Sequence, residues 1–248
     1  MSDADLAAEL AGEAGRLLLA LRASGRFDGK ALGKEGDAAA NRLIVAALRE
    51  RRPDDGLLSE ESRDDGTRLA RSRVWIVDPV DGTREYAEGR SDWAVHVALA
   101  IDGVPAIGAV ALPGLGLVLR SDTPSSLPSG GMPPRMVVSR TRPAPEALAV
   151  AQALAAELIP MGSAGAKAMA VVRGEADIYL HSGGQFEWDS CAPVAVAHAH
   201  GLHCSRIDGT PLIYNRPDVY LPDLLICQPD LAAPVLDLLA ACPVERNV

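Results

Sequence analysis

Three acidic residues, Glu60, Asp78 and Asp81, are the side chains of this sequence best suited to chemistry. Glu60 follows the apolar run 57–59, and Asp78 follows the β-branched run 74–77. Carboxylate oxygens without histidine or cysteine suit Mg²⁺, which keeps several waters and takes further ligands from a substrate phosphate. An isolated Glu-Glu or Asp-Pro pair is more often a solvated loop charge. The combination indicates instead a cation site for a phosphate ester.

The elements that position these acids are predicted from hydrophobic periodicity. Leucines in the stretch 3–23 recur on one helical stripe, and Asp37 precedes a second helical run, where its carboxylate could serve as the N-cap. Both acidic segments are expected at strand ends, and Asp102-Gly103 is typical of a hairpin turn. The first half should therefore contain helices over 3–23 and 38–51, strands ending at 59 and 77, and a long hairpin over 93–101 and 104–112.

The second half alternates between strand-like and helix-like segments, which favours an α/β arrangement. The expected elements are strands 136–139, 177–180 and 224–227, helices within 144–157, within 164–173, near 189–200 and over 230–241, and a hairpin around Asp208-Gly209. Between the halves lies a stretch rich in serine, proline and glycine. We therefore divide the chain into an α+β metal-binding half (1–120), a linker or loop (121–134) and an α/β half (135–248).

The composition limits the classes of function. The chain has 248 residues and a formal net charge of −9, which argues against a nucleic-acid polymer or an anionic membrane surface as the main partner. None of the four cysteines forms a CxxC motif, so a zinc ribbon or thiol redox motif is not indicated. The acidic N-terminus is unlike a secretory signal, and the most apolar stretch, 94–119, is broken by prolines and glycines. A cytoplasmic protein without a transmembrane segment is expected.

Three motifs resemble the inositol monophosphatase superfamily in order and spacing. They are LSEES at 58–62, WIVDPVDGT at 75–83, and Trp188-Asp189. The resemblance runs over nearly the whole chain, from Asp37 through the final third. It implies a layered αβαβα sandwich with the active site in a cleft between an α+β half and an α/β half.

The resemblance also implies the roles of the metal-site residues. Glu60, Asp78 and the backbone carbonyl of Val80 would hold one Mg²⁺, and Asp78, Asp81 and Asp189 a second. Asp37 would serve a further Mg²⁺ and pair with Thr83, which would accept a proton from the attacking water. Two or three Mg²⁺ ions are thus implied, with Li⁺ as an inhibitor that occupies one of their positions.

Two turns are expected to contact the phosphate groups. Gly82 and Thr83 should open a helix whose free amides can bind phosphate oxygens. Gly162-Ser163-Ala164 resembles the second substrate-holding turn of the superfamily, although alone it would read as a plain helix start. Lys167, one helical turn later, could reach a second phosphate or could be an exposed helix lysine. Arg84 and Arg140 are weaker candidates for the same contact.

The substrate is narrowed by two local features. Gly82-Thr83-Arg84-Glu85-Tyr86 resembles the continuation found in the 3'(2'),5'-bisphosphate nucleotidase (CysQ-type) branch. The segment 181–187 also lacks an acid where inositol phosphatases place one against ring hydroxyls. The predicted reaction is hydrolysis of adenosine 3',5'-bisphosphate (PAP) to AMP and phosphate, and the 3'-phosphate of its sulfated precursor (PAPS) is a second candidate. Inositol monophosphatase activity, fructose-1,6-bisphosphatase activity and a non-catalytic, metal-dependent binding module remain alternatives.

Some histidines and flanking residues fit this scheme less directly. The residues before Asp37 and after Asp189 depart from the superfamily's usual context, which leaves the metal served by Asp37 open. His198, His200 and His203 could suggest a zinc site, but their spacing favours residues at a helix terminus. His96 alternates with apolar neighbours and is predicted to be a hydrogen-bonded sheet residue. A homodimer is left open.

Overall fold

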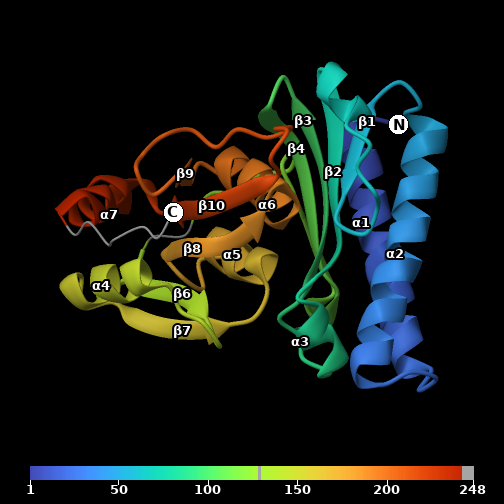
Figure 1. The fold of residues 1–248 in the computed structure, drawn as a ribbon. Helices are drawn as coiled ribbons and strands as arrows, with labels where there is room; N and C mark the ends of the chain where they lie inside the picture. Colours follow the sequence, from blue (N-terminus) through green and yellow to red (C-terminus); the bar gives the residue numbers. More distant parts are fainter. Residues whose placement is uncertain (128–129, 242–248) are drawn as a thin grey trace.

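The chain folds into two stacked β-sheets with helices on their outer faces and between them (Figure 1). The structure is a computed structural model that describes residues 1–127 and 130–241. Part of the predicted linker (128–129) and the end of the predicted second half (242–248) lie outside the described residues. Within the described ranges, no helix combines the length and apolar character needed to cross a bilayer.

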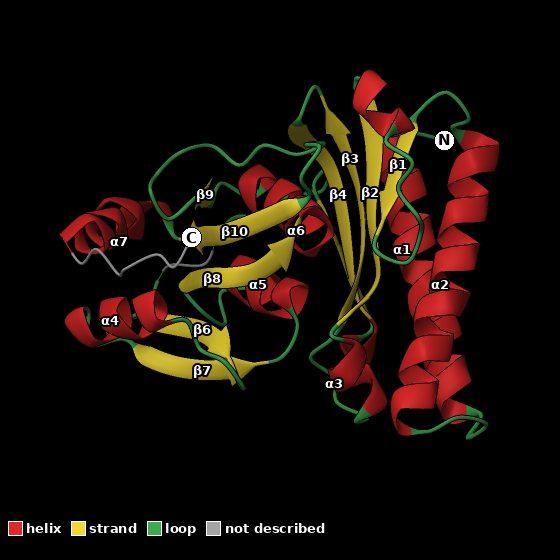
Figure 2. Ribbon diagram, in the orientation of Figure 1, coloured by secondary structure: helices red, strands yellow, loops and turns green. Residues whose placement is uncertain are grey.

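The first sheet has the spatial order β1-β2-β3-β4-β5. Its strands are β1 (Gly56–Ser59), β2 (Arg73–Asp81), β3 (Ala94–Ile101), β4 (Val104–Leu112) and β5 (Leu117–Arg120). β1 and β2 are parallel, and the other neighbours are antiparallel. The long helices α1 (Asp3–Ala23) and α2 (Gly29–Arg51) cover one face, and short α3 (Thr83–Ala87) follows β2 (Figure 2). Two 3-10 turns, Thr67–Ala70 and Pro113–Leu115, lie in the connections.

The second sheet has the order β7-β6-β8-β10-β9. Its strands are β6 (Arg135–Ser139), β7 (Glu157–Met161), β8 (Ile178–Phe186), β9 (His203–Ser205) and β10 (Tyr220–Cys227). Helices α5 (Ala164–Val172) and α6 (Glu187–Ala199) pack between the two sheets, while α4 (Pro145–Ala153) and α7 (Pro229–Ala241) cover the outer face. The layers therefore run αβαβα, which confirms the predicted fold class.

The central strands read as continuous apolar runs because both of their faces are buried. Along β2, Trp75 and Val77 pack against α1 and α2, whereas Val74 and Ile76 belong to the core between the sheets. Strands covered on both faces lose the polar alternation typical of a half-exposed sheet. This arrangement lets β2 deliver its acidic end to the middle of the molecule.

Three expected boundaries are wrong. Asp37 is not an N-cap, because α2 begins at Gly29 and contains it. β2 does not stop at 77 but runs to Asp81, and β8 does not stop at 180 but runs to Phe186. In β8, Gly183 and Gly184 have φ values of 82° and 78° and form an irregularity inside the strand.

The hairpin expected around Asp208-Gly209 is also wrong. The turn is present, with the Arg206 amide donating to the Thr210 carbonyl at 2.8 Å. β9, however, pairs with β10 rather than with the residues just after the turn. Pro211 follows the turn and has no amide hydrogen to start such a ladder. The short strands β5 and β7 were not predicted.

We expect Gly108→Ala to lower the melting temperature, because β4 and α6 approach so closely that only a glycine fits. An added Cβ at Gly108 would lie 2.5 Å from the Ala192 carbonyl oxygen and 2.8 Å from Ala195 Cβ. Such overpacking costs about 1–3 kcal/mol. The matched control is Gly12→Ala in α1, where the added Cβ meets side chains at 3.5 Å. This account would be contradicted if thermal denaturation gave the same melting temperature for the two variants.

Candidate active site

A β-bulge at the end of β2 shapes the acidic site. Between Asp78 and Asp81, β2 carries one more residue than the paired segment of β3. Pro79 has no amide hydrogen for the sheet, and Val80 donates its amide to Asp78 Oδ1 at 3.0 Å. The bulge lets both carboxyl groups, which are buried, lie at the same end of the strand.

Asp81 connects the two halves of the molecule. Its Oδ1 accepts the amide of Ala164 at 3.1 Å, and its Oδ2 accepts that of Gly165 at 2.5 Å. These amides open α5, where they have no partner inside the helix. Burial alone would raise the pKa of Asp81, but nearby His96, the Gly165 amide and Lys167 hold that pKa below its ordinary value. Asp81 is therefore a fixed, ionised carboxylate.

Asp189 joins this group from the second half. It lies in the first turn of α6, and its Oδ2 accepts the Phe186 amide at 2.7 Å. Carboxylate oxygens of Asp78, Asp81 and Asp189 lie within 4.8 Å of one another. The predicted pair Asp78 and Asp81 thus meets Asp189 from a distant part of the sequence.

Glu60 lies beside the three aspartates. Its amide donates to the Val77 carbonyl at 3.2 Å, which continues the pairing of β1 with β2. Partial desolvation of its carboxyl group, together with Asp37 and other nearby acids, raises the pKa of Glu60 to about 7. Burial and the charge of Asp81 likewise raise the pKa of Asp189 to about 7, and burial and Glu60 raise the pKa of Asp78 well above its ordinary value.

This clustering of acids fits a divalent cation. Without one, the carboxyl groups repel each other and resist ionisation, as the raised pKa values of Asp78 and Asp189 indicate. The available ligands are all oxygens, including the Val80 carbonyl, which suits a hard cation such as Mg²⁺. The residues present therefore fit the metal that the sequence predicts.

Two glycines of α2 bring Asp37 to Thr83. A Cβ at Gly33 would lie 2.8 Å from Thr83 Cγ2, and one at Gly36 would lie 2.7 Å from the ring of Tyr86. This close approach of α2 and α3 places Thr83 Oγ1 3.3 Å from Asp37 Oδ1 and 3.1 Å from the Val80 carbonyl, as donor in both contacts. Burial and the charge of Glu61 raise the pKa of Asp37 to about 7. Gly33 and Gly36, which precede the helix predicted from the sequence, are thus helical contact points.

Two members of the acidic group, Asp81 and Asp189, line a cavity of about 770 Å³ between the halves. The segment after β6 and the irregular part of β8 also line this cavity. The lining residues are Asp81, Gly82, Arg84, Glu85, Ser139, Arg140, Thr141, Arg142, Pro143, Ala144, Pro145, Gly162, Ser163, Ala164, Lys167, His181, Ser182, Gly183, Gly184, Gln185 and Asp189. All the predicted substrate contacts except Thr83 are on this wall.

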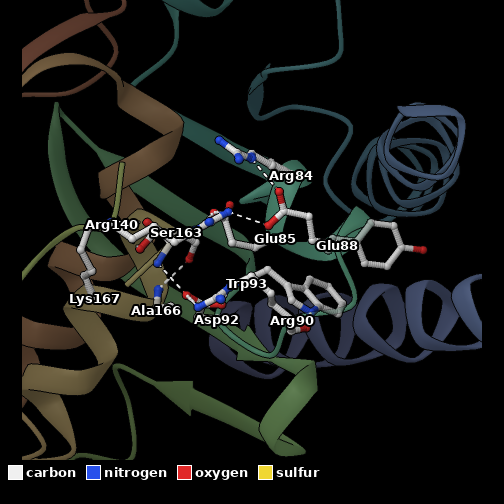
Figure 3. Close-up of polar contacts among 12 residues, drawn as sticks. Arg84, Glu85, Glu88, Arg90, Asp92, Trp93, Arg140, Ser163, Ala166 and Lys167 are labelled. Atoms are coloured by element: carbon white, nitrogen blue, oxygen red, sulfur yellow. Dashed lines mark hydrogen bonds and ion pairs between the residues drawn. The ribbon is translucent and has the colours of Figure 1, made fainter. Parts of the chain in front are cut away.

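The three arginines of the cavity differ in their partners. Arg84 pairs with Glu88 at 2.7 Å, and Arg140 pairs with Glu85 and Glu88, each at 2.7 Å (Figure 3). Arg142 uses its backbone amide to bind Ser139, and within the described ranges its guanidinium forms no ion pair. Arg142 is therefore the arginine whose charge is least compensated.

Lys167 is buried, so the interpretation as an exposed helix lysine is wrong. Its Nζ donates to the carbonyls of Gly162 and Ser163, the latter at 2.8 Å, and lies 5.3 Å from the centre of the Tyr179 ring. Ser163 caps α5 by accepting the Ala166 amide at 2.8 Å (Figure 3). Desolvation, only partly opposed by Asp81 and other acids, lowers the pKa of Lys167 to about 8. The Lys167 ammonium group therefore lies near Asp81 and the other acidic residues around the cavity.

The remaining predicted candidates lie elsewhere. His198 is exposed in the last turn of α6, His200 binds the Val196 carbonyl, and His203 contacts Ser205. They do not appear in the metal-compatible cluster found among the described residues. The interpretation as residues at a helix terminus is confirmed for His198 and His200, which lie at the end of α6, and is wrong for His203, which begins β9.

Two residues of this region, Arg142 and His96, were not predicted to belong to the site. Arg142 had no signal beyond its distance of two positions from Arg140. His96 was expected to be a bonded sheet residue, and its Nδ1 does lie 3.0 Å from the Trp188 carbonyl. Its Nε2, however, lies 3.2 Å from Asp81 Oδ2, an ion-pair distance without hydrogen-bond alignment. A polar residue on an otherwise small apolar strand face was the available signal.

The sequence profile of the inositol monophosphatase family matches residues 5–240. A 3'-phosphoadenosine 5'-phosphate phosphatase of Mycobacterium leprae (strain TN) is 52% identical, over 95% of this chain and 92% of that protein. The 3'(2'),5'-bisphosphate nucleotidase CysQ of Escherichia coli (strain K12) is 29% identical, over 75% and 80% of the two chains.

Solved structures show the same architecture. CysQ from Bacteroides thetaiotaomicron, described as a bacterial member of the inositol monophosphatase family, superposes with a TM-score of 0.78 at 26% identity. The match covers 91% of this chain and 97% of that chain. An inositol monophosphatase from Anabaena gives a TM-score of 0.76 at 22% identity, over 97% and 96% of the chains, and supports the fold alone.

We expect Mg²⁺ to raise the melting temperature more at pH 8 than at pH 6. The folded-state pKa values of Glu60 and Asp189, about 7, exceed those of ordinary carboxyl groups. In the metal-free protein their contribution to stability is complete below the unfolded-state pKa and is lost as the pH rises through about 7. A cation offsets this loss because it binds the deprotonated groups.

Thermal denaturation with EDTA or MgCl₂ at both pH values measures this effect. Asp78→Asn serves as the control, since it should abolish the Mg²⁺ shift and raise the melting temperature in EDTA at pH 8. An equal Mg²⁺ shift at pH 6 and pH 8 would contradict the assignment.

Proposed function

The chain belongs to the inositol monophosphatase family, and on this basis we propose that it hydrolyses the 3'-phosphate of PAP to give AMP and phosphate. One observation carries the proposal: Asp81 and Asp189 of the acidic cluster line a cavity whose wall also carries Arg142, an arginine that forms no ion pair within the described residues. Such a cavity suits a substrate with two phosphate groups. The relatives named for this activity, at 52% identity, support the same reaction.

The metal of this reaction is proposed to be Mg²⁺. Glu60, Asp78 and the Val80 carbonyl would hold one ion, and Asp78, Asp81 and Asp189 a second. A third ion would be served by Asp37. When bound, these ions supply a water of lowered pKa and neutralise charge on the phosphate. We also propose inhibition by Li⁺.

Thr83 and Asp37 are proposed to manage the proton of the attacking water. The Thr83 hydroxyl has one hydrogen, which it can give to Asp37 or to the Val80 carbonyl, and its lone pairs stay available to the water. The water oxygen attacks phosphorus in line and gives a proton to Thr83 Oγ1, whose own hydrogen passes to Asp37. The bond from phosphorus to the ribose 3'-oxygen breaks, and that oxygen takes a proton from solvent water. Gly82 and Ser163 lie against each other and would hold oxygens of the phosphate that is cleaved.

We assign the two phosphates of the substrate to different basic side chains of the cavity. Lys167 lies near Asp81 and Asp189, which supports a contact with the phosphate that is cleaved rather than the second-phosphate contact predicted from the sequence. Arg142 lies near His181, whose pKa is lowered to about 4 by burial and by the charges of Lys167 and Arg142, so this histidine is neutral at pH 7. We therefore assign the second phosphate to Arg142. Arg84 and Arg140 would contribute at the rim.

Other substrates fit the cavity less well. The wall formed by Ser182, Gly183 and Gly184 offers no carboxylate to inositol or fructose hydroxyl groups. A non-catalytic binding module would not need the contact between Thr83 and Asp37. The proposal further includes PAPS hydrolysis, a role in sulfate assimilation, a cytoplasmic location and a homodimer.

We expect PAP to be turned over faster than inositol 1-phosphate or fructose 1,6-bisphosphate. Phosphate release by the wild-type protein in MgCl₂, measured side by side on the three compounds, gives the ranking. Asp78→Asn should lower kcat at least about 100-fold, because charge stabilisation at the reacting phosphate is lost. A preference for inositol 1-phosphate would refute the nucleotide assignment.

We expect Arg142→Ala to raise KM for PAP about 10-fold or more, since a charge-assisted contact to a phosphate contributes about 1.5–3 kcal/mol. Hydrolysis of adenosine 3'-monophosphate, which lacks the second phosphate, should hardly change. Arg51→Ala, which removes an arginine paired with Glu9 outside the cavity, is the matched control. An equal rise in KM for both substrates would show that Arg142 does not bind the second phosphate.

A further inference from the structure

His96 is a fully buried polar side chain on a strand face made of small residues. On β3, Ala94, Ala98 and Ala100 share its face toward the second half, and all belong to the core between the sheets. An imidazole is costly to bury unless its nitrogens are paired. Packing alone would be served by another small apolar residue, so the histidine requires a different explanation.

The two ring nitrogens of His96 contact the two halves of the metal site. Nδ1 lies 3.0 Å from the carbonyl oxygen of Trp188, the residue just before Asp189, and must carry a hydrogen because a carbonyl only accepts. Nε2 lies 3.2 Å from Asp81 Oδ2. The ring thus spans the distance between one proposed ligand and the start of the helix that supplies another.

The surroundings of His96 are shaped to admit the ring in this position. Gly165 lies against it, and a Cβ there would fall well inside van der Waals contact with Nε2. The Gly165 amide binds the same Asp81 oxygen at 2.5 Å. Gly165 therefore serves two purposes: its amide holds Asp81, and its missing side chain leaves room for the imidazole.

We propose that His96 is a positioning residue that sets the separation of Asp81 and Asp189 and thereby the cation affinity of the site. The proposal rests on the proposed metal-dependent function. A carboxylate ligand with free rotation about its terminal torsion samples many directions, whereas Asp81 accepts two amides and has the His96 imidazole packed 3.2 Å from its Oδ2. Groups that orient metal ligands in this way typically change metal affinity or activity about 10–100-fold when they are removed.

Two substitutions separate the contacts of His96. In His96→Gln the amide nitrogen occupies the place of Nε2 and keeps the contact with Asp81. In His96→Asn the amide nitrogen of the shorter side chain occupies the place of Nδ1 and keeps only the contact with the Trp188 carbonyl. Mg²⁺ affinity is measured by isothermal titration calorimetry and by the Mg²⁺ concentration for half-maximal thermal stabilisation, and the melting temperature in EDTA reports the fold.

We expect His96→Asn to weaken Mg²⁺ binding about 10–100-fold and His96→Gln to stay within about threefold of wild type. Gly165→Ala, which displaces the ring, should resemble His96→Asn and provides a second test if the asparagine variant does not fold. The inference is overturned if both His96 variants lose affinity equally, or if melting temperatures in EDTA fall while Mg²⁺ affinity is unchanged. A wild-type protein that ignores Mg²⁺ would instead refute the proposed function.

Discussion

The carboxylate of Asp81 is the point on which the arrangement of the two halves depends. It belongs to the first sheet, yet it accepts the first two amides of α5 from the second half. A negative charge at a helix N-terminus is favourable, and here the interaction is buried, where charge-assisted hydrogen bonds are strong. The same carboxylate faces Asp78 and Asp189. One side chain therefore fixes the sheet-to-helix contact and one corner of the acidic cluster.

Other close approaches reinforce this contact. The amides of Gly162 and Ser163 are bound by the side chain and carbonyl of Asp92, and Gly162 lies against Glu85. On the opposite side of the site, Glu187 accepts two backbone amides at 215–216, which keeps the first turn of α6 in place. These contacts hold the backbone around Gly162 and Glu187 in place, whereas Arg140 and Arg142 of the cavity lie in the connection between β6 and α4.

The sequence predicts the fold class and the acidic ligands because their signals are local. The bulge motif from Asp78 to Thr83 and the pair Trp188-Asp189 are short, and β2 shows a continuous apolar run. What it does not predict depends on contacts across the fold. The inclusion of Gly33 and Gly36 in α2 depends on their close contact with α3, and the burial of Lys167 depends on its packing near the Tyr179 ring. The separate environments of Arg140 and Arg142 likewise depend on which acids lie nearby.

The docking of α5 and α6 onto the end of β2 also affects how the chain folds. Asp81 and Asp189 are far apart in the sequence, and each half supplies only part of the cluster. Contacts of such long range form late, because loop-closure entropy must be overcome before they contribute. A chain with one sheet folded would have only part of the acidic cluster, whereas the finished protein brings Asp78, Asp81 and Asp189 together. Cation binding would thus select the fully assembled chain and shift the folding equilibrium toward it.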